Sequence, residues 1–433
     1  MADPTRLRRE VGLGGAALLG LGSMVGTGVF VSIGIAAGVA GPSLMAATVL
    51  AALVAAANGL SSAQLAAAHP VSGGTYEYGY LWLTPSFGFA AGWLFLLAKS
   101  ASAATAALGF GGYFLDVAGY ASPGWRIATA LLATLAITAF VAGGIRRSNR
   151  GNAIIVGLTL AALLALVAFS LPVVIPDGLG NFTPFLPDPA DGPGGWGALL
   201  HGTALMFVAF TGYGRIATLA EEVRDPGRVI PPAVVLTMAI VSLLYLAVAF
   251  AGVGVLGAEE FGRAAERTAA PLEAVAAALQ IPWLALAVAL AAVTAMLGVL
   301  LNLVLGLSRV LLAMARRRDA PAPFRRISTA RGSPVHAVWA CGLGVAALVL
   351  IGDVRVTWSF SAFTVLLYYG ITNLAALRLP PEKRLFPRWV PGFGLVGCLG
   401  LAFWVETTIW ITGLAVLAVG LAGHFLRRRL TPE

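Results

Sequence analysis

The sequence predicts an all-α integral membrane protein with about twelve transmembrane helices, and three observations support this. Of its 433 residues, 59% are hydrophobic and 11% are charged, whereas soluble domains average about 25% charged residues. The apolar runs are long and continuous, which disfavours a transmembrane β-barrel, whose strands alternate over about ten residues. The basic residues fall in short segments between these runs, as the loops of a helical membrane protein require.

Twelve apolar runs are predicted to cross the bilayer, which takes roughly 20 helical residues. The predicted spans are 12–38, 43–66, 87–115, 125–144, 152–175, 198–220, 232–256, 281–312, 335–352, 357–378, 390–405 and 407–426. We interpret residues 1–433 as a single transmembrane domain. The segment at 69–80 is too polar to span and is predicted to lie at the membrane interface.

The positions of arginine and lysine predict the orientation of the chain. If the N-terminus is cytoplasmic, the basic clusters all fall on the inside, and the outer segments hold only Arg126, Arg263, Arg267 and Arg355. This positive-inside bias fits an even number of spans, with both termini cytoplasmic. We therefore expect a multi-pass protein of the inner (cytoplasmic) membrane. The net charge of +9 reflects this topology, so no nucleic-acid partner is expected.

Enzyme chemistry is not expected from this sequence. Both cysteines, Cys341 and Cys398, fall in apolar spans, so neither a disulfide framework nor a metal site is predicted. No paired carboxylates or nucleophile–base pair lie at membrane depth, and no phosphate-binding loop is present. We predict a protein that is not an enzyme and needs no cofactor or metal.

Two spans are interrupted near the middle by glycines and small hydroxyl residues. The first interruption lies within Leu21–Phe30 and the second within Phe207–Gly214. Glycine weakens a helix, and bare backbone at membrane depth survives only where it lines an enclosed or wet cavity. Two broken spans at corresponding places indicate the binding site of a secondary transporter built from inverted repeats. The repeats are predicted at about 12–175 and 198–378, followed by two extra helices at about 390–426.

At this point the chain resembles the amino acid–polyamine–organocation transporters, near their bacterial cationic-amino-acid-transporter-like branch. The matching motifs are Gly26-Thr27-Gly28-Val29-Phe30, His69-Pro70-x-Ser72-Gly73-Gly74-x-Tyr76-x-Tyr78 with Gly92-Trp93, Phe210-Thr211-Gly212-Tyr213-Gly214 through Glu221-Glu222-Val223-Arg224-Asp225-Pro226 and Ile230-Pro231, Ser308-Arg309-Val310 with Ala313-Met314-Ala315-Arg316, and Asn373-Leu374-Ala375-Ala376-Leu377-Arg378. The resemblance implies the five-plus-five inverted-repeat fold shared with LeuT, with helices 1 and 6 broken. It also implies a secondary transporter of amino acids that works by alternating access.

The breaks offer groups that suit both charges of an amino acid. A half-helix that begins after the first break presents free N–H groups to a carboxylate, and we assign this role to Gly26, Thr27 and Gly28. Carbonyls of Met24 and of residues 208–211 are expected to accept from the ammonium, and Phe210 is the predicted gate. The substrate-binding candidates are Ser23, Met24, Gly26, Thr27, Gly28, Ser100, Phe207, Val208, Phe210, Thr211 and Gly212. For any isolated small-residue cluster, helix packing is the alternative role.

Lys99 lies deep in the third predicted span, with no acidic residue in that span. An ionisable group at this depth indicates function. LeuT-like proteins place a sodium ion near spans 1 and 8, and some relatives place a lysine on span 5 instead, where this chain has Thr159. We hypothesise that Lys99 replaces a bound cation and couples transport to protons without sodium. The alternative is a permanently charged lysine that serves folding alone.

The substrate is predicted to be a neutral L-amino acid, because no span centre offers a carboxylate for a cationic side chain. A cationic amino acid, polyamine or other organic amine is the alternative, since carbonyls and aromatic rings also bind cations. A sensor or channel on the same fold is a remoter alternative. The expected partners are the substrate and the lipid bilayer, and the sequence leaves open whether the protein is a monomer or a homodimer.

Overall fold

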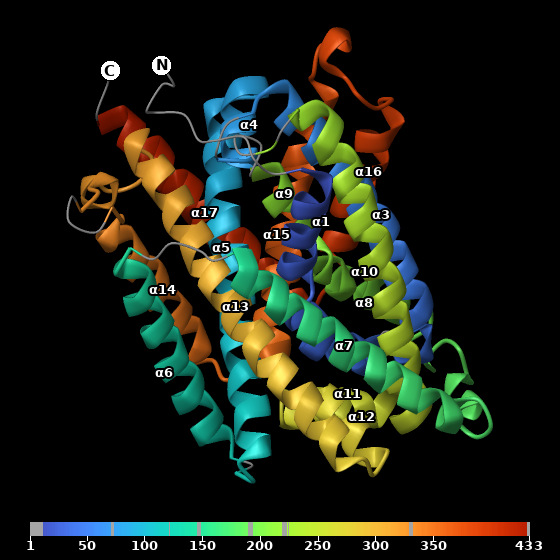
Figure 1. The fold of residues 1–433 in the computed structure, drawn as a ribbon. Coiled ribbons are helices and arrows are strands. Elements are labelled where there is room, and N and C mark those ends of the chain that lie inside the picture. Colours follow the sequence, from blue (N-terminus) through green and yellow to red (C-terminus); the bar gives the residue numbers. More distant parts are fainter. Residues whose placement is uncertain are drawn as a thin grey trace.

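A computed structural model describes residues 12–70, 73–120, 122–144, 149–188, 194–218, 223, 225–328 and 332–430. All regular elements among these residues are helices, as the apolar composition predicts. Figure 1 shows a bundle of long helices with α4 at one end and α11 and α12 at the other. The segments predicted to lie on opposite sides of the membrane therefore lie at opposite ends of the bundle.

The first predicted span is divided into two helical pieces, as expected. Helix α1 (Leu13–Met24) ends where Val25 leaves the helical conformation, with φ −77° and ψ 92°. A π-helical turn, η1 (Gly28–Ser32), continues into α2 (Ile33–Ala40). The chain then reverses through the 3₁₀ turn η2 (Gly41–Ser43) into the long helix α3 (Leu44–Ala68).

The next four helices complete the first half of the chain. They are α4 (Thr75–Trp82), α5 (Pro85–Val117), α6 (Pro123–Ala142) and α7 (Asn149–Val174). Part of the predicted interfacial segment forms the short helix α4, which packs on α5 and α15. A proline at the first position of α5 and of α6 suits a helix start, where no N–H is needed for the helix ladder.

The second predicted break is also present. Helix α8 (Trp196–Ala209) stops at Phe210, the 3₁₀ turn η5 (Thr211–Tyr213) follows, and α9 (Gly214–Thr218) continues the span. Helix α10 (Pro226–Leu256) then leads to two short helices, α11 (Ala258–Arg267) and α12 (Pro271–Ala278). These two helices form from a segment with mixed charge between two predicted spans.

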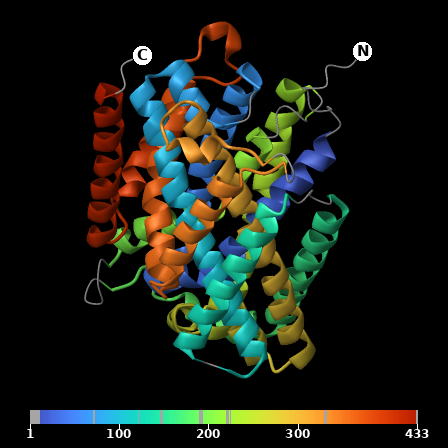
Figure 2. The ribbon, with the colours of Figure 1, turned by 90° about the vertical axis from the view of Figure 1, so that its left-hand side faces the viewer.

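The last part of the chain contains five further helices. They are α13 (Pro282–Arg316), α14 (Val335–Val349), α15 (Val354–Leu377), α16 (Trp389–Ala402) and α17 (Thr407–Leu430). Three short 3₁₀ turns, η3 (Gly178–Phe182), η6 (Ala322–Arg325) and η7 (Pro381–Lys383), lie in the loops. Figure 2 shows α17 along the edge of the bundle.

Eight helical stretches of the described chain are long and apolar enough to cross a membrane, and three shorter apolar helices accompany them. The protein is therefore a helical membrane protein, while the count of twelve spans and the inverted repeat stay predictions. Helix α5 packs against both α13 and α15, and α3 packs against α10. Hydroxyl pairs join α5 to α15, with 2.7 Å between Ser102 Oγ and Ser361 Oγ and 2.8 Å between Thr105 Oγ1 and Thr357 Oγ1. Such small polar residues allow close helix packing in a bilayer.

Candidate functional site

The two breaks lie against each other in the interior of the bundle. A Cβ atom added to Gly28 would lie 2.8 Å from the Cβ atom of Ala209, and one added to Gly212 would lie 2.5 Å from the carbonyl oxygen of Ser23. Real Cβ atoms do not approach that closely, so both positions require glycine for this contact. The glycines that interrupt the two helices therefore also let the two interruptions meet.

A tyrosine on α10 connects the two breaks. The hydroxyl of Tyr245 donates to the carbonyl of Met24 at 2.7 Å and lies 3.2 Å from the carbonyl of Ala209, each the last residue of its half-helix. The ring of Phe210 packs against that of Tyr245, with 5.0 Å between centroids. Tyr245 is fully buried, and it satisfies carbonyls that the helix ladders leave free.

The first break contains a polar group without a partner. The side chain of Thr27 is 4% exposed, and its hydroxyl makes no hydrogen bond to any residue that the structure describes. The Gly26 carbonyl accepts from the N–H groups of Val29 and Phe30, at 3.0 and 3.1 Å. Most buried hydroxyls in proteins are hydrogen-bonded, so an unsatisfied one at a helix break is a candidate ligand-binding group.

Two carbonyls at the second break accept hydrogen bonds from side-chain hydroxyls. The Val208 carbonyl accepts from the Thr211 hydroxyl at 2.8 Å, and the Thr211 carbonyl accepts from the hydroxyl of Tyr369 on α15 at 3.2 Å. A carbonyl oxygen has two lone pairs, so a carbonyl that accepts a single hydrogen bond can accept a second donor.

Lys99 reaches the second break from α5. Its Nζ atom donates to the Thr211 hydroxyl at 2.9 Å, and the side chain is half-buried. Thr159 on α7 instead donates to the carbonyl of Ile155 in its own helix at 2.7 Å. Of the two predicted coupling positions, the structure brings Lys99 to a break, and no hydrogen bond joins it to Thr159 in the described chain. The coupling role stays a prediction.

The side chains of the other predicted site residues make different contacts. The hydroxyl of Ser23 donates to the carbonyl of Leu19 at 2.8 Å, so it is used within α1. Met24 and Phe207 are buried, and the ring of Phe207 meets Tyr369 edge to face. Ser100 follows Lys99 on α5 and is half-buried.

Tyr245 and Tyr369 were not among the predicted site residues. Each is a tyrosine inside a predicted span, and a buried phenol usually finds a hydrogen-bond partner. This rule predicts that both hydroxyls are hydrogen-bonded, but it does not predict that their acceptors lie at the helix breaks. Among the described residues, no group of three or more histidine, cysteine or acidic side chains is arranged to hold a metal ion.

Helices apolar enough to span a membrane surround two interrupted helices that contact each other. This arrangement is typical of a multi-pass membrane transporter. The profile of the family described as "Amino acid permease" matches residues 12–424, so the chain belongs to the amino acid permease family. An uncharacterized transporter of Mycobacterium tuberculosis is 40% identical over 99% of this chain and 93% of its own length. The branched-chain amino acid permease BcaP of Bacillus subtilis is 28% identical over 98% of this chain and 94% of its own. The vacuolar cationic amino acid transporter 2 of Arabidopsis thaliana is 26% identical over 85% of this chain and 60% of its own.

Proposed function

We propose that this permease is a secondary transporter that moves neutral L-amino acids across the cytoplasmic membrane by alternating access. The observation that supports it best is the unpartnered, buried hydroxyl of Thr27, which lies in a helix break in contact with a second break. In this proposal the substrate carboxylate binds the Thr27 hydroxyl and nearby N–H groups. The ammonium binds the remaining lone pairs of the carbonyls at the second break.

A neutral substrate fits the charges around the breaks. No carboxylate side chain of the described residues makes a hydrogen bond or ion pair with either break, whereas Lys99 contacts Thr211. An arginine or lysine substrate would therefore meet a like charge without a counter-charge. The relative named as a branched-chain amino acid permease agrees with this proposal, and the relative named as a cationic amino acid transporter keeps the cationic alternative open.

Proton coupling is proposed to depend on Lys99. A cation that already contacts the second break supplies the positive charge that a bound sodium ion supplies elsewhere on this fold, so sodium is not expected to be required. Loss of its proton would remove the positive charge from the group that contacts the Thr211 hydroxyl and so change the electrostatics of the site. The proposed orientation places both termini in the cytoplasm, because the positive-inside bias of the loops favours it.

The first test is uptake of labelled amino acids into sodium-free proteoliposomes at several pH values. We expect wild-type protein to take up neutral amino acids, with a rate that depends on pH. The variant Lys99→Met keeps a side chain of similar length without charge, and we expect it to lose that pH dependence. Ser170→Ala is the matched control on α7, because the Ser170 hydroxyl donates to the Leu166 carbonyl within its own helix at 2.8 Å, and it should keep the wild-type pH profile.

The possible results separate the parts of the proposal. Uptake of arginine or lysine in preference to neutral species would overturn the neutral substrate but keep the transporter. A Lys99→Met variant with wild-type rate and pH dependence would overturn the coupling role alone. An absolute requirement for sodium would contradict the proposal that Lys99 replaces the bound cation.

A further inference from the structure

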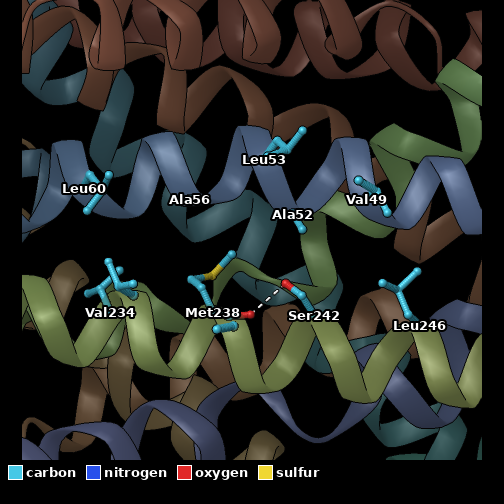
Figure 3. A pocket seen from close by; sticks show the side chains of 11 residues that line it. Val49, Ala52, Leu53, Ala56, Leu60, Val234, Met238, Ser242 and Leu246 are labelled. Carbon is cyan, nitrogen blue, oxygen red and sulfur yellow. Dashed lines mark hydrogen bonds between the residues drawn. The ribbon is translucent and has the colours of Figure 1, made fainter.

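An apolar groove of about 350 Å³ lies between α3 and α10, and none of its lining residues belongs to either break. Figure 3 shows the two helices side by side with the lining side chains between them. The groove is lined by Val49, Ala52, Leu53, Ala56, Leu60, Val234, Val235, Met238, Ala239, Ser242 and Leu246. Neither the family nor the proposed transport cycle assigns a role to it.

Small side chains leave the groove open. Ala52 and Ala56 are one helical turn apart on α3, and Ala239 lies on α10. Such residues on neighbouring helices allow close packing, and beside the contact between α3 and α10 they leave a shallow apolar groove. The one hydroxyl in the lining, that of Ser242, donates to the Met238 carbonyl at 2.7 Å. The lining therefore offers no free donor to a polar ligand.

The groove opens on a surface that faces the bilayer. Of its lining residues, Leu53 and Val235 are each 54% exposed and Val49 is 43% exposed. Both α3 and α10 belong to stretches long and apolar enough to span a membrane. In a membrane protein such exposed aliphatic side chains contact lipid tails, so the material at the mouth of the groove is hydrocarbon.

The dimensions of the groove match one hydrocarbon chain. Val49 and Leu60 mark its length along α3, and at 1.5 Å per residue they are roughly 16 Å apart. An extended acyl chain can lie along this length, in contact with the apolar side chains of both helices.

We infer that this groove binds one acyl chain of a bilayer lipid, laid lengthwise between α3 and α10. The chain is held by van der Waals contacts with the apolar lining, because transfer from lipid to an apolar groove gains no hydrophobic free energy. An acyl chain in this position fills space that the two helices would otherwise leave empty. The chain therefore covers the lipid-facing side of the contact between α3 and α10, the second and seventh predicted spans.

The test is photolabelling in proteoliposomes made with a phosphatidylglycerol that carries a diazirine midway along one acyl chain. Peptides cross-linked to the lipid are then identified by mass spectrometry. We expect labelling to concentrate on the peptides of α3 and α10 that contain groove residues. The variant Ala56→Phe fills the groove from α3, and it should lower the labelling of those peptides severalfold while leaving labelling elsewhere unchanged.

Two further variants keep the inference testable. Ala239→Leu fills the groove from the α10 side, where Ala239 is exposed, and serves if Ala56→Phe does not fold. Ala161→Phe is the matched control, because Ala161 is exposed at mid-span on α7, outside the groove. Labelling spread evenly over all lipid-facing helices would overturn the inference. Unchanged labelling in the filled variants would overturn it as well, as would a cross-linked dimer formed through the groove.

Discussion

At the scale of single residues, removal of the unpartnered Thr27 hydroxyl is predicted to have opposite effects on transport and on stability. An unsatisfied buried hydroxyl destabilises the empty protein, because it loses water without gaining a partner. The variant Thr27→Val keeps the side-chain shape and removes the hydroxyl. We expect it to lower uptake at low substrate concentration by about tenfold to a hundredfold, since a hydrogen bond to a charged group contributes about 1.5–3 kcal/mol. Thermal unfolding of the substrate-free variant should occur at an equal or higher temperature.

The conservative variant Thr27→Ser is the control for this prediction. It retains the hydroxyl, so most of the uptake should remain. A Thr27→Val variant that transports normally would show that the hydroxyl does not bind substrate. Loss of both uptake and thermal stability would indicate a structural role instead.

Glu273 on α12 gives a prediction about pH. Burial, together with the neighbouring carboxyl of Asp116, raises the pKa of Glu273 to about 8. The folded protein therefore binds this proton more tightly than the unfolded chain, and the associated stability is lost as pH rises from about 4.5 towards 8. We expect Glu273→Gln to raise the melting temperature by roughly 2 °C at pH 8.5 and to change it little at pH 4. A difference that grew towards acid pH would contradict this assignment.

At the scale of elements, the sequence was sufficient to place the two helix breaks. Glycine and small hydroxyl residues weaken a helix locally, and the structure interrupts both spans at Val25 and Phe210, where those residues gather. The ends of long helices such as α5 and α13 also lie close to their predicted limits. These features depend on near neighbours in the chain, which is why a local pattern predicts them.

The contacts that join the breaks depend on residues far apart in the sequence. Tyr245 lies 221 residues from Met24, and Lys99 lies 112 residues from Thr211. No periodicity or motif fixes which rotamer such a side chain adopts or which carbonyl it meets. The sequence therefore predicted that Lys99 acts inside the bundle but not its partner, and it missed Tyr245 entirely.

At the scale of the whole molecule, a network of charged residues joins four elements at the end of the bundle where α11 lies. His201 of α8 is 3.4 Å from Glu406, which precedes α17. Arg355 at the start of α15 contacts Glu406 at 3.0 Å and Glu266 of α11 at 3.1 Å. Glu406 thus ties the first half of a broken helix to the rest of the bundle.

The ionisation of Glu406 determines at which pH this network contributes to the stability of the fold. Burial of Glu406 acts to raise its pKa, but the contacts with His201 and Arg355 outweigh burial and lower the pKa to about 2. The carboxylate is therefore charged at physiological pH. Because the pKa is lowered on folding, the stabilisation is present above about pH 4.5 and is lost as pH falls towards 2.

We therefore expect Glu406→Gln to lower the free energy of unfolding by about 1–2 kcal/mol at pH 7, since it removes the charged partner of the buried His201 and one of the two carboxylates that contact Arg355. Glu259→Gln is the matched control. The side chain of Glu259 is 78% exposed in its pair with Arg263, and exposed pairs contribute about 0–1 kcal/mol. Denaturation of both variants in the same detergent measures the difference, which should shrink as pH falls below 4. Equal effects of the two substitutions would mean that the network does not hold α8, the first half of the broken helix, in place.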